Sequence, residues 1–294
     1  MTPAASRTAG SGSGTRGAAY IALASVLFAV MAMLAKRSTL RLPGQEVAFI
    51  RFVVGLVACA VAATRMRLRA RNWTGLLLRG GLGGLAVSCY FLAIEHLPVG
   101  TATLLNYTAP VFTAFWAALF LAEPIGRQAV LALLVTTTGV ALVIVGNRAT
   151  APPGSFGFGP WQLVGVASAV LSGAAIATIR EVRKTDGSWE IFGAFCLIGA
   201  VITGVPTATH WVTPTPVEWG YLVATGLVSV AAQLLMTYSF RFVKAAVGGI
   251  VMQLTPVAAI VLGFLIYGEV APALSVGGAA ITLLGVSWGA WLAR

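Results

Sequence analysis

The stretch Leu104–Pro124 reads LLNYTAPVFTAFWAALFLAEP and combines an apolar run with features that a lipid-facing helix avoids. It carries the adjacent polar residues Asn106 and Tyr107, a proline at position 110, and Glu123 where the apolar run ends. Polar side chains in hydrocarbon are costly unless they face protein or water. The stretch therefore predicts a membrane-spanning helix that faces the interior of the protein.

The composition of the whole chain is typical of an integral membrane protein. Of its 294 residues, 58% are hydrophobic and 9% are charged, whereas about a quarter of the residues of a soluble domain are charged. A helix needs about 20 mostly apolar residues to cross a bilayer. Ten such windows lie at 18–37, 45–64, 74–95, 99–121, 125–147, 160–181, 189–208, 217–240, 245–267 and 272–292. The predicted fold is an all-α polytopic membrane protein with ten transmembrane helices.

The net charge of +11 is distributed unevenly between the two sides of the predicted membrane. With the N-terminus inside, the inner segments carry thirteen basic residues, namely Arg7, Arg16, Arg65, Arg67, Arg69, Arg71, Arg127, Arg180, Arg183, Lys184, Arg241, Lys244 and Arg294. The outer segments carry four, namely Lys36, Arg37, Arg41 and Arg148, while Arg51 and Arg79 lie inside predicted spans. The positive-inside rule therefore places both termini in the cytoplasm. The basic charge is interpreted as topology and attraction to anionic lipid rather than nucleic-acid binding.

The opening pattern occurs a second time at a constant offset of 146 residues. Residues 252–270 read MQLTPVAAIVLGFLIYGEV, so Pro110 aligns with Pro256 and Glu123 with Glu269. Each copy contains five spans, an odd number, so the second copy enters the membrane from the opposite side. The pattern predicts two inverted five-helix repeats around a central cavity, with an alternating-access site between them.

The boundaries of the repeats follow from the spans. The first repeat is predicted over residues 18–147 and the second over residues 160–292, with a Pro- and Gly-rich connecting loop at 148–159. Residues 1–17, which are rich in Ser, Gly, Thr and Ala, are predicted to be a disordered cytoplasmic segment. A signal peptide is the alternative for this end of the chain, but the first span is needed to complete the first repeat.

These features resemble a known family. Two tandem five-span units, a fourth span ending in Pro-x(12)-Glu and a glycine-bearing fifth span resemble the EamA-type members of the drug/metabolite transporter superfamily. Within it, the element Asn106-Tyr107-x-x-Pro110 is similar to that of bacterial aromatic amino-acid exporters. The resemblance implies a multi-pass transporter of the bacterial inner membrane that exports small metabolites by alternating access.

The predicted cavity would be lined by polar and aromatic residues near the middle of the membrane. The candidate substrate-binding residues are Asn106, Tyr107, Tyr90, Gln233, Tyr238, Gln253, Ser25, Phe28 and Ser172. A serine in a span frequently bonds to its own helix, so packing is the alternative role for Ser25 and Ser172. Pro110 and Pro256 are candidate hinges, with a static kink as the alternative.

Neutral polar groups mixed with aromatic rings favour neutral or aromatic amino acids as substrates, carried by facilitated diffusion or exchange. All eight acidic residues lie at span ends or in loops, whereas ion coupling commonly uses a carboxylate at depth. Glu123 and Glu269 are interpreted as helix caps, with a gate or an ion-coupling group as the alternative. Glu46 lies five residues before Arg51 and is a plausible structural partner for it. A broad-specificity metabolite or drug exporter coupled to a proton gradient remains the alternative function.

Other classes of function find little support in the sequence. The three cysteines occur singly, without metal-ligand spacing, and the two histidines lie at outer edges of spans. An enzyme, a metal site and a cofactor are therefore not expected, and the absence of a Walker-type glycine loop argues against ATP hydrolysis. The expected partners are a small-molecule substrate and membrane lipids. The small-residue faces Gly80-x-x-x-Gly84 and Gly285-x-x-x-Gly289 favour packing within a monomer, with a dimer as the alternative.

Overall fold

The computed structural model describes residues 11–39, 41–96, 105–122, 125–146, 159–267 and 272–292. The helices in these ranges are α1 (Ser11–Ser38), α2 (Gly44–Arg65), α3 (Trp73–His96), α5 (Ala109–Phe120), α6 (Arg127–Gly146), α7 (Pro160–Val182), α8 (Ser188–Thr209), α9 (Pro216–Ser239), α10 (Ala245–Met252), α11 (Leu254–Tyr267) and α12 (Ala273–Leu292). Seven of them, α1, α2, α3, α7, α8, α9 and α12, are long and apolar enough to cross a membrane. The predicted all-α membrane fold is confirmed for the described residues, although they do not establish a count of ten spans.

Local sequence sets where several helices begin. α9 begins at Pro216, whose missing N–H is not needed in a first helical turn. The Thr215 hydroxyl accepts the Glu218 amide at 3.4 Å, and the Glu218 carboxylate accepts the Thr215 amide at 2.7 Å, which is a reciprocal cap. At the start of the chain, α1 begins at Ser11, so residues 11–17 are helical where disorder was predicted. Residues 1–10 and most of the predicted loop at 148–159 lie outside the described residues.

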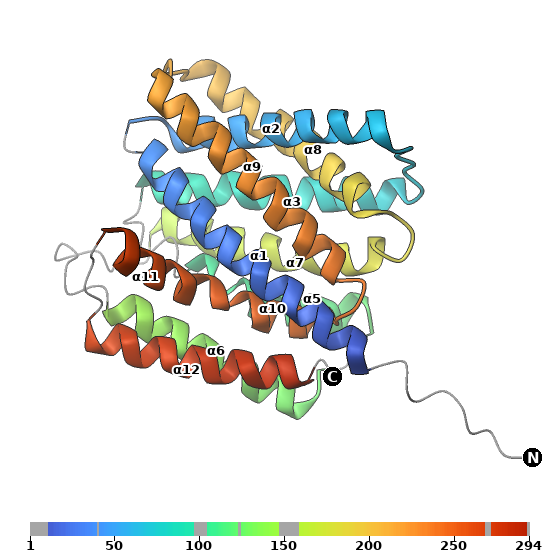
Figure 1. The fold of residues 1–294 in the computed structure, drawn as a ribbon, viewed down its shortest axis with the longest axis vertical. Coiled ribbons are helices and arrows are strands. Elements are labelled where there is room, and N and C mark those ends of the chain that lie inside the picture. The colour runs from blue at the N-terminus through green and yellow to red at the C-terminus, as the bar shows by residue number, and fades with distance from the viewer. Residues whose placement is uncertain are drawn as a thin grey trace, which may run out of the picture.

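The helices form one bundle whose packing partners correspond between the two halves of the chain. Figure 1 shows α2 and α8 together at the top of the view and α6 and α12 together at the bottom. Between these pairs, α1 is the equivalent of α7, α3 of α9 and α5 of α11. Helix α1 packs against α9 and α11, and α7 packs in the same way against their equivalents α3 and α5. Each of these contacts therefore has a counterpart in which the roles of the two halves are exchanged.

The α6–α12 contact shows how the two halves are oriented. Gly139 of α6 lies against Thr282 of α12, and Gly285 of α12 lies against Thr136 of α6. These four residues are two pairs related by the offset of 146. Residue numbers rise along one helix as they fall along the other, so equivalent helices of the two halves run antiparallel.

Both predicted small-residue faces are used for packing inside the chain. A Cβ on Gly80 would lie 2.8 Å from the Ala194 carbonyl of α8, and one on Gly84 would lie 3.0 Å from Gly199. Gly289 similarly packs against Ile250 of α10. Glycine lets helix backbones approach closely where lipid provides no hydrophobic drive for association.

The two predicted spans that contain the prolines are broken rather than bent at the proline. A turn at Tyr107 and Thr108 precedes α5, and a turn at Gln253 separates α10 from α11. Tyr107 and Gln253 are equivalent positions, 146 residues apart. The Thr108 amide donates to the Leu105 carbonyl at 3.2 Å and the Gln253 amide to the Ile250 carbonyl at 3.1 Å, so each break is closed by a tight local bond.

The prediction of a bend at each proline is therefore corrected. Pro110 lies at the second position of α5, and Pro256 lies at the third position of α11. In a first turn the missing proline N–H would have no intrahelical partner in any case. Each proline thus starts the second piece of a divided helix.

The α6–α12 contact leads to a test of the packing. A Cβ on Gly139 would lie 2.5 Å from the backbone nitrogen of Thr282, which cannot move aside as a side chain could. We expect Gly139→Val and Gly285→Val each to lower the free energy of unfolding by about 1–3 kcal/mol, the usual cost of overpacking. Thermal unfolding of detergent-purified protein measures this effect. Gly277→Val on α12, where a side chain meets open space, is the matched control, and equal unfolding temperatures for Gly139→Val and this control would contradict the close approach.

Candidate functional site

A chain of polar contacts ties the first helix break to α3 and α7. The Asn106 amide donates to the Ser168 hydroxyl at 3.0 Å, and the Ser168 hydroxyl donates to the Ala86 carbonyl at 2.9 Å. Ser168 is completely buried, and Asn106 is partly buried. Asn106 therefore faces protein, and its side chain has further hydrogen-bonding capacity at the junction of three elements.

The second break places another amide inside the bundle. Gln253 is completely buried, and its Nε2 donates to the Thr137 hydroxyl of α6 at 3.3 Å. Among the described residues, no donor bonds to its Oε1 or to Oε1 of Gln233 on α9, which is 8% exposed. Buried amide oxygens are nearly always hydrogen-bonded. These two oxygens are therefore available to a donor from a ligand or water.

The two broken helices touch each other. Pro110 is buried at the start of α5 and lies against Gly249 of α10, where an added Cβ would come within 3.4 Å of it. Trp116 of α5 faces protein as well, because its indole N–H donates to the Val170 carbonyl of α7 at 3.1 Å. Helix α5 of the first half therefore contacts both α7 and α10 of the second half.

The remaining predicted residues do not all gather there. The Ser25 hydroxyl is completely buried and donates to the Ile21 carbonyl of its own helix at 2.9 Å, in line with the alternative packing role. Phe28 packs against an apolar core cluster, and Tyr90 lies edge-on to Phe91 with ring centroids 5.8 Å apart. Ser172 and Tyr107 are partly buried, on α7 and at the first break respectively.

Tyr238 lies apart from these residues. It occupies the last turn of α9, is 38% exposed, and packs edge-on against Tyr20 with centroids 5.5 Å apart. The Arg183 guanidinium lies 6.0 Å from the Tyr238 ring centroid. Tyr238 is therefore placed at one end of the bundle rather than at the depth of the helix breaks.

The two predicted helix caps, Glu123 and Glu269, lie outside the described residues. Glu46 is buried in the first turn of α2, where its Oε2 accepts the Val212 amide at 2.9 Å. The suggested Glu46–Arg51 pair is wrong for this structure, since Arg51 directs Nη1 to the Met31 sulfur at 3.7 Å.

Sequence reasoning gave no binding role to Arg51 and Arg79, although the structure buries both. They are 8% and 4% exposed, on α2 and α3 respectively. Their signal in the sequence was an isolated positive charge within an otherwise apolar run, which in a membrane marks a functional site more often than in a soluble protein.

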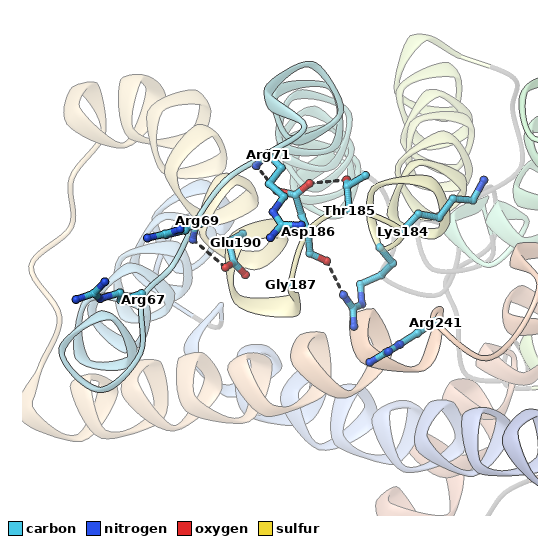
Figure 2. A pocket seen from close by; sticks show the side chains of 10 residues that line it. Arg67, Arg69, Arg71, Lys184, Thr185, Asp186, Gly187, Glu190 and Arg241 are labelled. Carbon is cyan, nitrogen blue, oxygen red and sulfur yellow. Dashed lines mark hydrogen bonds between the residues drawn. The ribbon is translucent and has the colours of Figure 1, made fainter.

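A basic hollow of about 390 Å³ opens at one end of the bundle, as Figure 2 shows. It lies among the α2–α3 connection, the α7–α8 connection and the end of α9, and is lined by Arg67, Arg69, Arg71, Arg183, Lys184, Thr185, Asp186, Gly187, Glu190 and Arg241. Gly17 of α1 packs against Phe242 and Val243, so the start of α1 is at the same end. Much of the basic charge predicted to be cytoplasmic is therefore gathered on one face.

Asp186 holds the connections around this hollow together. It is 3% exposed and accepts the amides of Arg71 at 2.7 Å and Asn72 at 3.1 Å and the Thr185 hydroxyl at 2.6 Å. Burial raises the pKa of Asp186, but these hydrogen bonds outweigh burial and leave the pKa below its ordinary value. The Arg183 guanidinium donates to the Asp186 carbonyl, and burial followed by repulsion from Arg241 lowers the pKa of Arg183.

Comparison with known proteins places both halves of the chain in one family. The EamA-like transporter family matches residues 15–145 and again residues 159–288. The pseudopaline exporter CntI of Pseudomonas aeruginosa is 30% identical over 266 residues, which cover 89% of this chain and 91% of that protein. A probable terminal-alkyne amino-acid exporter of Streptantibioticus cattleyicolor is 29% identical over 253 residues, 80% of each protein. A solved crystal structure with 23% identity has a TM-score of 0.79, covering 94% of this chain and 97% of that one, which shows a common fold.

The Asp186 contacts lead to a pH-dependent prediction. Because the folded-state pKa of Asp186 is depressed, its stabilisation is present above the unfolded-state pKa and is lost as pH falls through the folded-state pKa. Asp186→Asn should lower the free energy of unfolding at pH 7 by about 1–3 kcal/mol. The difference should shrink as both proteins are titrated into the acid range, in chemical unfolding followed by tryptophan fluorescence. Glu181→Gln, which removes an exposed carboxylate paired with Lys184, is the control, and an equal loss for both variants would contradict the anchoring role.

Proposed function

This chain belongs to the EamA-like transporter family, and we propose that it exports small metabolites, foremost neutral and aromatic amino acids, across a bacterial inner membrane. The resemblance to EamA-type transporters inferred from the sequence is thereby confirmed at the level of the family. The observation that carries the proposal is the pair of helix breaks at equivalent positions, Tyr107 and Gln253, beside which α5 contacts α10 through Pro110 and Gly249. Polar groups at such breaks are available to a substrate in a protein otherwise built for lipid.

The proposed architecture is ten spans in two inverted five-helix repeats around a central site. α10 and α11 together make one span, and α5 with the residues before it makes another. The antiparallel contact of α6 with α12 supports an inverted relation, because equivalent helices of inverted repeats cross the membrane in opposite directions. Rocking of one repeat against the other would then open the site to each side in turn.

The basic hollow supports the orientation. Its arginines, together with the start of α1, lie at one end of the bundle, and cytoplasmic ends of membrane proteins carry an excess of Lys and Arg. Both termini are accordingly assigned to the cytoplasm. A monomer is the proposed unit, with a dimer as the alternative, because the small-residue faces are occupied within the chain.

Amino-acid export follows from the chemistry of the breaks. Asn106 and Gln253 offer neutral hydrogen-bonding groups, and Trp116, an aromatic residue of α5, is held against α7 by its bond to the Val170 carbonyl. One relative is named a probable terminal-alkyne amino-acid exporter, which supports the same class. The second candidate, a broad metabolite or drug exporter coupled to a proton gradient, is favoured by the different compound named for the pseudopaline exporter.

The mechanism proposed is facilitated diffusion or exchange without ATP hydrolysis. Each carboxylate whose side chain the structure describes lies within a turn of a helix end or in a connection, namely Glu46, Glu181, Asp186, Glu190 and Glu218. Proton or sodium coupling commonly relies on a carboxylate in the middle of the membrane. The described part of the chain therefore favours transport that follows the substrate gradient.

Counterflow into liposomes tests this function. Purified protein should exchange labelled phenylalanine or another neutral amino acid saturably, with and without an imposed pH gradient. Asn106→Ala should lower the exchange rate roughly tenfold if this amide bonds to substrate in the pathway. Thr178→Ala on α7, whose hydroxyl bonds back to the Ala174 carbonyl of its own helix at 2.8 Å, is the matched control. Accumulation only under a pH gradient would favour the proton-coupled alternative, and no flux of any amino acid from folded protein would refute amino-acid export.

The divided helices give a second test. Pro110→Ala and Pro256→Ala restore a backbone N–H in the first turn of α5 and α11, which allows each helix to extend back across its break. If the breaks serve as hinges, both variants should slow exchange severalfold while keeping a folded, monodisperse protein. Pro216→Ala at the start of α9, a continuous helix, should exchange normally. Full exchange by both break variants would support a static role for the prolines.

A further inference from the structure

Two arginines lie deep in the bundle, away from the basic hollow. Arg51 is in the eighth position of α2 and Arg79 in the seventh position of α3. At a rise of about 1.5 Å per residue, each lies roughly 9–11 Å from the nearer end of its helix. Both helices are long and apolar enough to span a membrane. Two positive charges therefore sit within the hydrocarbon depth.

Neither guanidinium has an anionic partner among the residues that the structure describes. The contacts of Arg51 are the Met31 sulfur, the Phe52 ring at 4.9 Å and the Phe195 ring at 6.0 Å. The Phe195 ring is also the partner of Arg79, at 4.2 Å. Nη2 of Arg51 and both Nε and Nη1 of Arg79 are buried and find no hydrogen-bond acceptor in the part of the chain that the structure describes. An unpaired buried charge of this kind is costly, and aromatic faces offset only part of that cost.

The direction of the Arg79 side chain is informative. A long basic side chain near a helix end usually extends back to the membrane surface. Arg79 instead directs its guanidinium over Gly83, one turn further along α3, where any Cβ would collide with Nη1. Since the nearer end of α3 is at Trp73, the charge points toward the membrane interior. Glycine at position 83 makes this orientation sterically feasible.

The same face of α3 connects Arg79 to the first helix break. Ala86 and Tyr90 lie seven and eleven residues after Arg79, which places all three on one side of the helix. The Ala86 carbonyl accepts a hydrogen bond from the Ser168 hydroxyl, and this hydroxyl accepts one from the Asn106 side-chain amide. Arg51 of α2 lies close to Arg79, because both guanidiniums contact the Phe195 ring. One helical face thus runs from the two charges to the polar chain at the break.

We propose that Arg51 and Arg79 form a site for the carboxylate of the transported substrate. The inference rests on the proposed transport function and adds an anionic group to the substrate class. A guanidinium presents parallel N–H donors that match the two oxygens of a carboxylate, and the unpaired donors of both arginines supply them. The Phe195 ring that both guanidiniums contact fixes their positions. The rest of the substrate would extend along α3 toward Tyr90 and Asn106.

Thermal unfolding of the detergent-purified full chain tests the site without relying on transport. Phenylacetate and its neutral amide phenylacetamide are the probes, in a gluconate buffer free of chloride. Phenylacetate should raise the unfolding temperature of the wild type, and phenylacetamide should not. Arg51→Gln and Arg79→Gln should each raise the phenylacetate concentration that gives half of the maximal temperature shift, roughly tenfold or more. Arg127→Gln, which removes an exposed charge at the start of α6, should respond like the wild type.

Counterflow on the same proteins links the site to transport. L-phenylalanine should compete for exchange far better than L-phenylalaninamide, and this preference should disappear in Arg79→Gln. Should the glutamine variants fail to fold, Arg51→Lys and Arg79→Lys keep the charge but lose the paired donors, and they should weaken phenylacetate binding severalfold.

Equal shifts from phenylacetate and phenylacetamide, or a phenylacetate shift that persists in Arg79→Gln, would overturn the proposal. If sodium chloride raises the unfolding temperature as much as phenylacetate does, the site holds an inorganic anion, and this result would overturn the proposal as well. Phenylacetate protection that depends on both arginines, in a protein without amino-acid exchange, would instead refute the transport function and leave the anion site standing.

Discussion

The absence of water in the hydrocarbon core is the constraint on which this structure depends. A backbone amide or carbonyl that leaves a helix there finds no partner in lipid, so irregular backbone is tolerated only inside protein. The breaks at Tyr107 and Gln253 meet this requirement, because each is closed by a local bond to the residue three positions earlier. Packing of α5 against α7 and α10 covers the region. The breaks thereby fix which helices must lie at the centre of the bundle.

Close approach of helices is the second consequence of a lipid solvent. Apolar side chains gain little by leaving lipid for protein, so association depends on packing contacts between small residues. Gly139 and Gly285 each lie against a threonine of the opposite helix, and the threonine hydroxyls bond back to their own helices. The contact is therefore close and reciprocal. This reciprocity gives the antiparallel relation of the halves a physical basis beyond a likeness of sequence.

The sequence predicted the elements well because composition and the 146-residue offset are strong signals. It did not locate the breaks, because a proline pattern indicates where a helix is disturbed and not which side of the proline the turn occupies. The partner of Glu46 also escaped prediction. A spacing of five residues suggested Arg51, whereas the amide of Val212, 166 residues away, takes the bond. Tyr238 was placed too deep, although the predicted span at 217–240 already ends two residues after it, close to the end of α9 at Ser239.

Arginine has two roles in this chain, and depth separates them. Around the hollow, Arg183 donates to a backbone carbonyl, and the Arg69 amide donates to a glutamate at 3.1 Å, in a wide and open setting. Most of the basic residues there are exposed and are assigned to orientation, namely Arg67, Arg69, Arg71, Lys184 and Arg241. Arg51 and Arg79 are buried without a carboxylate partner among the described residues, and their guanidiniums lie over aromatic rings. A positive charge that costs this much to bury is most useful where the protein must draw an anion out of water. Depth in the bundle, rather than residue type, therefore separates the arginines that bind a substrate from those that set the orientation in the membrane.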